Sequence, residues 1–137
     1  MMQRYMLDTN VVSHIMQGRD ADLLARLVQV PVGQVVISSV TLAELEYGLH
    51  RKGHPERLKN AMAQVLLRMD VLPWDEAVAK CYGGFCSAIE AQGINLSDFD
   101  MMIAAHAVAV DATLVSRDKA FAQVSTGASP ALRLEVW

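Results

Sequence analysis

Short apolar segments alternate with longer segments of helical periodicity along the whole sequence. Five segments have the length and composition of a strand: residues 4–7, 35–37, 71–72, 113–115 and 132–136. Between them, apolar residues recur three or four positions apart, as they do on one face of a helix. Strands that alternate with helices form a parallel sheet with helices on both faces. The pattern therefore predicts an α/β fold of three layers, α/β/α, with a mostly parallel central sheet.

Local signals mark the starts of several of these helices. Asp20 and Asp75 each precede an apolar-periodic segment. They are candidate N-caps, because a carboxylate there accepts hydrogen bonds from the free N–H groups of the first turn. Thr41 and Glu44 have the spacing of a capping box, and the helix that contains them is expected to fray from Gly48 onwards.

Length and composition narrow the class of protein. A chain of 137 residues has the usual length of one domain, and we expect a single domain over residues 1–137. The hydrophobic content of 53% predicts a well-filled core and excludes a disordered chain. No apolar run approaches the roughly 20 residues of a membrane-spanning helix, so we expect a cytoplasmic protein with Cys81 and Cys86 reduced. A net charge of −3 argues against duplex binding by charge alone.

Acidic residues recur where predicted strands give way to helices. Asp8 follows the first strand, and Glu44 lies early in the helix after the second. Asp100 opens an apolar helix, and Asp118 follows the strand at residues 113–115. The carboxyl ends of parallel strands meet at one edge of a sheet, which is where ligands bind. Four carboxylates at that edge therefore predict a cation site.

Each of these acids also has a purely structural explanation. Asp8 and Asp100 can cap the helices that they precede, Glu44 can serve the capping box, and Asp118 can stabilise a turn. Asp98 can cap the same helix as Asp100. For one acid alone this explanation is at least as good as a functional one, and only the joint occurrence of four acids favours a cation site.

Carboxylates brought together in this way do not all stay ionised without a counter-charge. Two of them about 5 Å apart repel by roughly 3 kcal/mol at an effective dielectric constant of about 20. Ligands that are all oxygen favour Mg²⁺ or Mn²⁺ over zinc, and these ions activate water for attack on phosphorus. The acids therefore point to hydrolysis of phosphodiester bonds. Thr9 and Asn10 are candidate donors to a water molecule or a phosphate oxygen.

Taken together, four stretches resemble the PIN domain, and closely its VapC type of ribonuclease toxin. They are residues 6–10 (MLDTN), 38–48 (SSVTLAELEYG), 99–107 (FDMMIAAHA) and 112–118 (ATLVSRD). Their order and spacing are similar to those of the family over essentially the whole chain. The resemblance implies a PIN-like fold and an endoribonuclease that depends on Mg²⁺ or Mn²⁺.

The same resemblance implies roles for individual residues. Asp8, Glu44, Asp100 and Asp118 correspond to the family's catalytic acids, with Asp8 and Asp100 as metal ligands and the other two as further ligands. Asp98 departs from the usual pattern. For Asp98, the roles of outer ligand, helix cap and neutral residue all remain open.

Similar toxins act on structured RNA, and several cut initiator tRNA, so the kinship implies an RNA substrate with tRNA as the expected class. Arg117 and Lys119 flank Asp118 and are candidate contacts to RNA phosphates, although a solvated turn explains them slightly better. Four more cations form a candidate basic rim, for which a solvated surface is an equal alternative: Arg51, Lys52, Arg57 and Lys59.

The kinship also implies a homodimer that a cognate VapB-like antitoxin holds inactive in a higher-order complex. The antitoxin is expected in an apolar groove between the helices at residues 11–16 and 42–49. Gly83 and Gly84 each cost roughly 1 kcal/mol relative to alanine within a helix, which indicates close packing against another surface, such as a second subunit. His106 is expected to bond within the fold rather than to act as a general base.

Other classes of protein also place an aspartate at the end of the first strand. A haloacid-dehalogenase-like phosphatase needs a second aspartate two residues on, where this chain has Asn10. A receiver-like signalling module needs a lysine near the last strand, for which Lys119 is a poor candidate, and it leaves Glu44 without a role. A binding domain with degenerate acids stays open as an alternative, but it does not explain why the four carboxylates converge.

Overall fold

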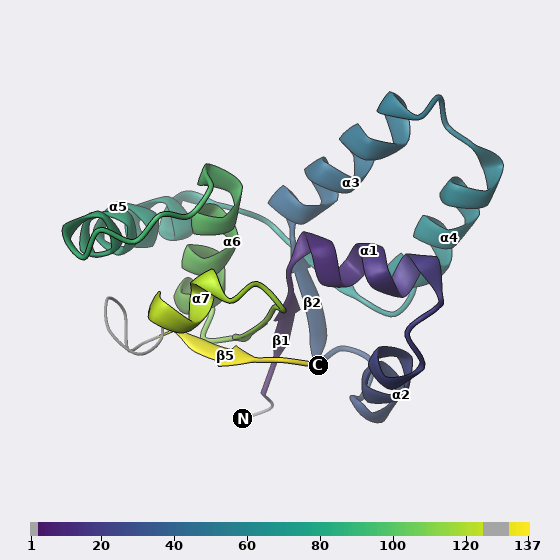
Figure 1. The fold of residues 1–137 in the computed structure, drawn as a ribbon, viewed down its shortest axis with the longest axis horizontal. Coiled ribbons are helices and arrows are strands. Elements are labelled where there is room, and N and C mark those ends of the chain that lie inside the picture. The colour runs from purple at the N-terminus through teal and green to yellow at the C-terminus, as the bar shows by residue number, and fades with distance from the viewer. Residues whose placement is uncertain (1–2, 125–131) are drawn as a thin grey trace.

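The computed structural model describes residues 3–124 and 132–137, and strands and helices alternate along them (Figure 1). The strands are β1 (Tyr5–Leu7), β2 (Val35–Ser38), β3 (Asp70–Leu72), β4 (Thr113–Val115) and β5 (Arg133–Glu135). The helices are α1 (Thr9–Gln17), α2 (Ala21–Gln29), α3 (Ser39–Arg51), α4 (Glu56–Leu66), α5 (Glu76–Ala91), α6 (Asp98–Ala109) and α7 (Ala120–Gln123). Each predicted strand is present, and its ends lie within one residue of the predicted bounds.

The five strands form one sheet in the order β3–β2–β1–β4–β5, and all neighbouring pairs are parallel. Tyr5 pairs with Val35 on one side and with Thr113 on the other, so β1 is the central strand. The chain builds the sheet outward from β1 to β3 and then returns to add β4 and β5 on the other side. This reversal makes the carboxyl ends of β1 and β4 the topological switch point, the place where α/β sheets bind ligands.

The sheet separates two hydrophobic clusters. Successive strand residues point to opposite faces, so Met6 packs in the cluster beneath α5, α6 and α7, while Leu7 packs in the cluster beneath α1 to α4. Leu114 and Val115 of β4 divide between the clusters in the same way. Figure 1 shows the two groups of helices on opposite sides of the strands. The arrangement confirms the predicted three-layer α/β/α fold.

The predicted helix caps at Asp20 and Asp75 are confirmed, and the predicted capping box is wrong. The Asp20 carboxylate accepts a hydrogen bond from the Leu23 N–H at 3.0 Å, and Asp75 caps α5 in the same way. By contrast, α3 begins at Ser39 and its N-cap is Ser38, so the predicted capping box of Thr41 and Glu44 does not exist. Both of its residues lie within α3 and are free to make contacts elsewhere.

Two further predictions about helix ends are corrected. Helix α6 begins at Asp98, and its N-cap is Ser97, whose hydroxyl accepts a hydrogen bond from the Asp100 N–H at 3.2 Å. Neither Asp98 nor Asp100 is therefore the cap. Helix α3 continues through Gly48 to Arg51 instead of fraying, because the backbone there keeps its helical hydrogen bonds.

The structure also bears on the predictions about the two glycines, the two cysteines and membrane-spanning helices. An alanine Cβ at Gly83 or Gly84 would meet no atom within 4 Å, so nothing in the described chain explains the two glycines by close packing. Cys81 and Cys86 are free thiols, as predicted. Within residues 3–124 and 132–137, the helices are too short or too polar to cross a membrane.

Candidate active site

Asp8 occupies the carboxyl end of the central strand and begins α1. Its carboxylate accepts a hydrogen bond from the Val11 N–H at 2.9 Å, and its own N–H donates to the Val115 carbonyl oxygen of β4 at 3.1 Å. The residue is 4% exposed. A carboxylate in this position is fixed by the sheet, the helix and the neighbouring strand together.

The surroundings of Asp8 disfavour its negative charge. Burial is the largest effect and raises the pKa of the Asp8 carboxyl. Hydrogen bonds from Ser116 and from the Val11 N–H act in the opposite direction, and the charges of Asp100 and Asp118 raise the pKa further. Asp100 and Asp118 therefore lie within electrostatic range of Asp8, as the sequence predicted.

Asp100 and Asp118 come from different elements and also repel one another. Asp100 lies in the first turn of α6, where burial first and the charge of Asp118 next raise the pKa of its carboxyl, against the hydrogen bond with Ser97. Asp118 lies in the loop after β4, and its carboxylate accepts a hydrogen bond from the Ala120 N–H at 2.9 Å. Three acids, from the end of β1, from α6 and from the β4–α7 loop, thus lie within electrostatic range of one another at the switch point.

Ser116 is a residue of this site that the sequence analysis did not identify. It is 1% exposed, its side chain is hydrogen-bonded to Asp8, and its Oγ accepts a hydrogen bond from the Asp118 N–H at 3.1 Å. One hydroxyl therefore connects two of the acids. A serine after a short strand carries no signal in the sequence that would distinguish it from a turn residue.

Glu44 reaches the site through a hydrogen bond rather than by direct contact with another acid. The Thr9 hydroxyl donates to Glu44 Oε1 at 2.6 Å and lies 3.3 Å from the Thr41 hydroxyl. Because Thr9 follows Asp8 directly, this bond holds the Glu44 side chain beside the end of β1. Thr9 was predicted as a donor to water or phosphate, and here it donates to Glu44.

The carboxylates are gathered but are not arranged as a complete metal cage. Within residues 3–124 and 132–137, no group of three or more His, Cys, Asp or Glu side chains is close enough to hold a metal ion. The donors at the switch point are all carboxylate oxygens, and Mg²⁺ takes one or two carboxylates directly and retains water for its other positions. The donor set therefore suits a hydrated divalent cation.

Asp98 lies on another side of α6. Burial raises the pKa of the Cys86 thiol of α5, and the charges of Glu90 and Asp98 raise it further despite the hydrogen bond with Tyr82. The carboxylate of Asp98 is therefore close to α5, and Asp98 is exposed to solvent. A role for Asp98 as an outer ligand stays a prediction without a contact to support it.

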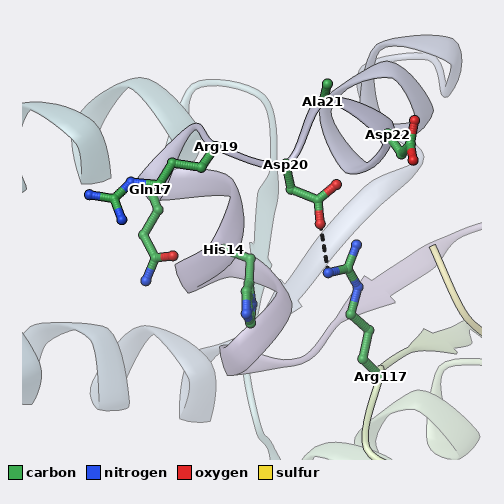
Figure 2. A pocket seen from close by; sticks show the side chains of 7 residues that line it. All are labelled: His14, Gln17, Arg19, Asp20, Ala21, Asp22 and Arg117. Atoms are coloured by element: carbon green, nitrogen blue, oxygen red, sulfur yellow. Dashed lines mark ion pairs between the residues drawn. The ribbon is translucent and has the colours of Figure 1, made fainter.

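Arg117 is held in place by two partners. Its Nη1 atom lies 2.7 Å from Asp20 Oδ2, and its Nε–H donates to the Trp137 carbonyl oxygen at 2.9 Å. Figure 2 shows this ion pair across a pocket of about 390 Å³, with His14 beside it. A smaller pocket, lined in part by Asn10 and Asp118, shares His14 and Arg117 with it. Lys119, in contrast, is exposed and makes no ion pair with any described residue.

His106 is buried away from these acids. It is 0% exposed, and its Nδ1 atom lies 2.8 Å from the Ser38 hydroxyl oxygen. Burial lowers the pKa of the imidazole, and the charge of Arg4 lowers it further, while Asp75 acts in the opposite direction. The histidine is therefore bonded within the fold, as the sequence analysis expected.

Comparison with known proteins places this geometry in a family. The PIN domain matches residues 5–127 of the chain. Ribonuclease VapC2 of Haemophilus influenzae is 34% identical over 99% of each chain. The chain belongs to the PIN-domain family, in its VapC branch. The tRNA(fMet)-specific endonuclease VapC of Shigella flexneri is 37% identical to this PIN domain over 77% of this chain and 80% of that protein.

Solved structures of VapC proteins share the fold of this PIN domain. VapBC2 of Rickettsia felis, bound to a DNA fragment from its promoter, aligns with a TM-score of 0.89 and 28% identity, over 98% of this chain and 99% of that one. DNA-bound VapBC of Salmonella typhimurium aligns with a TM-score of 0.87 and 28% identity over 99% of each chain. The predicted PIN-like fold is therefore confirmed.

Proposed function

We propose that this PIN domain is a metal-dependent endoribonuclease toxin that hydrolyses phosphodiester bonds in structured RNA. One observation carries the proposal: Asp8, Asp100 and Asp118 converge at the switch point of a PIN domain of the VapC branch. Similar proteins include a ribonuclease and a tRNA endonuclease, which supports nuclease activity for this chain. The carboxylates supply the chemistry that such an enzyme needs.

The mutual repulsion of the acids supports a divalent cation as the cofactor. Each carboxylate that loses water on burial, or approaches another carboxylate, is stabilised by a positive charge beside it. Asp8 and Asp100 are the proposed direct ligands, and Glu44 and Asp118 are further ligands. Mg²⁺ or Mn²⁺ bound there would neutralise the phosphate and lower the pKa of the attacking water.

The remaining residues of the site fix and orient the acids. The Val11 N–H and the Ser116 hydroxyl hold the Asp8 carboxylate, so its free oxygen keeps one direction. Thr9 does the same for Glu44. Asn10 is exposed in the small pocket beside Asp118, where its amide group is available to a phosphate oxygen. These contacts prepare the site before the substrate arrives.

We also propose the partners of this enzyme. The Shigella flexneri relative is a tRNA(fMet)-specific endonuclease. This similarity supports tRNA, and initiator tRNA in particular, as the substrate. The VapBC complexes among similar structures support a VapB-like antitoxin that binds the toxin and keeps it inactive. Cleavage of tRNA would stop translation and growth until the antitoxin neutralises the toxin. A homodimer in a larger complex with the antitoxin is part of the same proposal.

The test compares cleavage of a total tRNA pool by the wild-type protein and by Asp8→Asn, each purified free of antitoxin. Reactions contain Mg²⁺, Mn²⁺ or EDTA, and circular dichroism verifies folding. We expect cleavage by the wild type with either ion, and none in EDTA or by Asp8→Asn. Cleavage that survives both EDTA and the substitution would contradict the metal-dependent mechanism.

A further inference from the structure

A third pocket lies at the far end of α1 from Asp8. It has a volume of about 370 Å³ and is formed by the last turn of α1, the α3–α4 turn and the start of α4. Three cationic side chains line it, Arg19, Lys52 and Arg57, and no acidic residue does. The pocket is therefore locally positive in a chain whose net charge is −3.

The three cations have no acidic partner among the described residues. Five of the twelve lysines and arginines form ion pairs, in which the acids are Glu135, Glu56, Glu76, Asp20 and Asp111. Arg19, Lys52 and Arg57 make no ion pair with any described residue, and all three are exposed. Their positive charge is therefore available to an anion from outside the chain.

The rest of the lining suits a nucleotide. Ser13 and Gln17 offer a hydroxyl and an amide, which donate hydrogen bonds to phosphate oxygens. Met16, Pro55 and Leu58 provide apolar surface for a ribose or a base. Cations and neutral donors are the groups that contact a nucleic-acid backbone.

A chain of pockets along α1 connects this one to the acids. The pocket beside Asp118 shares His14 and Arg117 with the pocket of Figure 2, and that pocket shares Gln17 and Arg19 with the cationic one. In Figure 2, Gln17 and Arg19 extend away from the Asp20–Arg117 ion pair, on the other side of α1. The surface is therefore lined by pockets from the acids to the three cations.

From this geometry we infer that the pocket of Arg19, Lys52 and Arg57 binds a backbone phosphate of the RNA substrate at a distance from the cleaved bond. Helix α1 has 9 residues and is about 13 Å long. The phosphate therefore lies about one length of α1 from the bond at Asp8. The inference rests on the proposed function and adds the direction in which the RNA leaves the acids.

The test measures RNA affinity separately from cleavage. In an Asp8→Asn background, fluorescence anisotropy with a labelled tRNA pool is recorded over a range of KCl concentrations in EDTA. The site variant carries Arg19→Ala, Lys52→Ala and Arg57→Ala. The control carries Arg26→Ala, Lys80→Ala and Arg133→Ala, which removes the same number of positive charges from residues outside both the pocket and the candidate basic rim.

We expect the site variant to bind tRNA on the order of tenfold more weakly and to show a salt dependence whose slope is smaller by about 2. The control variant is expected to retain most of its affinity and slope. With Asp8 intact, the site substitutions should raise KM for tRNA cleavage and leave kcat unchanged, because these residues do not contact the cleaved bond.

Three results would overturn the inference. The first is unchanged tRNA affinity in the site variant, and the second is an equal loss of tRNA affinity in the site and control variants. The third comes from the same measurement with a short oligo-glutamate peptide: the site variant loses affinity for the peptide but retains its affinity for tRNA. The last result would show a site for an acidic protein segment. If the wild type fails to cleave tRNA but the site variant alone loses affinity for it, the proposed function is wrong and the binding site stands.

Discussion

Asp8 combines two roles that the sequence presented as alternatives. It caps α1 through the Val11 N–H, and it also belongs to the group of acids at the switch point. The cap stabilises the helix, whereas burial beside Asp100 and Asp118 destabilises the charged carboxylate. A residue kept in such surroundings indicates a ligand with positive charge, because an asparagine would cap the helix equally well without the repulsion.

We therefore predict that Asp8→Asn is more stable than the wild type at neutral pH in EDTA. The pKa of Asp8 is raised in the folded state, so its favourable contribution exists only at low pH and is lost as the pH rises through the folded-state pKa. Asparagine removes this loss and keeps the cap. The expected gain is on the order of 1 kcal/mol, or about 4 °C in Tm by thermal unfolding.

The exposed Asp70→Asn is the matched control, and its Tm should not change. At a pH of about 3, where both states of Asp8 are protonated, the advantage of Asp8→Asn should disappear. A lower Tm for Asp8→Asn at neutral pH would show that the carboxylate is stabilising as it stands and needs no cation.

His106 makes a second prediction about a single residue. Its pKa is lowered by burial, so the unfolded state binds a proton at a pH where the folded state does not. This contribution to stability is present above the unfolded pKa of about 6.5 and is lost as the pH falls below it. The free energy of unfolding in urea should therefore decrease between about pH 7 and pH 5, and less so in His106→Gln.

The exposed His50→Gln serves as the comparison, because it removes an imidazole that is not buried. If His106→Gln and the wild type lose equal stability over this range, His106 is protonated in the folded state. Its contact with Ser38 would then need another description.

At the scale of elements, the loop after β4 is held by contacts that the sequence did not predict. Arg117 stays a candidate phosphate ligand because it flanks Asp118, and in the structure it joins the loop to the N-cap of α2 and to Trp137. Contacts between residues so far apart in the chain leave no periodic signal. The helix starts at Asp20 and Asp75 were predictable because an N-cap acts on its own first turn.

The pair of Asp20 and Arg117 should show coupling in a double-mutant cycle. Asp20→Asn keeps an acceptor for the Leu23 N–H and removes only the charge, and Arg117→Met removes the guanidinium. Urea unfolding of the four proteins should give a combined loss smaller than the sum of the single losses. The coupling should weaken in high salt, because this pair is near the surface. Additive losses at low salt would mean that the ion pair does not fasten the loop to α2.

At the scale of the whole molecule, strand–helix alternation was sufficient to predict the three layers and the parallel sheet. Strand order was not predicted, because pairing depends on contacts between distant residues. The order places β1 beside β4 and so brings Asp8 to Asp118, with Asp100 above them on α6. Side-chain hydrogen bonds such as Thr9 to Glu44 and Ser116 to Asp8 follow from that placement, and only the structure reveals them.

The central claim is that Asp8 and Asp100 hold a divalent cation, and calorimetric titration with Mn²⁺ tests it most directly. The proteins are the wild type, Asp8→Asn, Asp100→Asn and Asp98→Asn. Asp98→Asn is the control, because the wild-type Asp98 carboxylate lies toward α5. We predict binding by the wild type and by Asp98→Asn with similar Kd, and affinity weaker by about tenfold or more, roughly 1.4 kcal/mol, in the other two. Equal affinity in all four proteins, or no binding by the wild type, would contradict the claim.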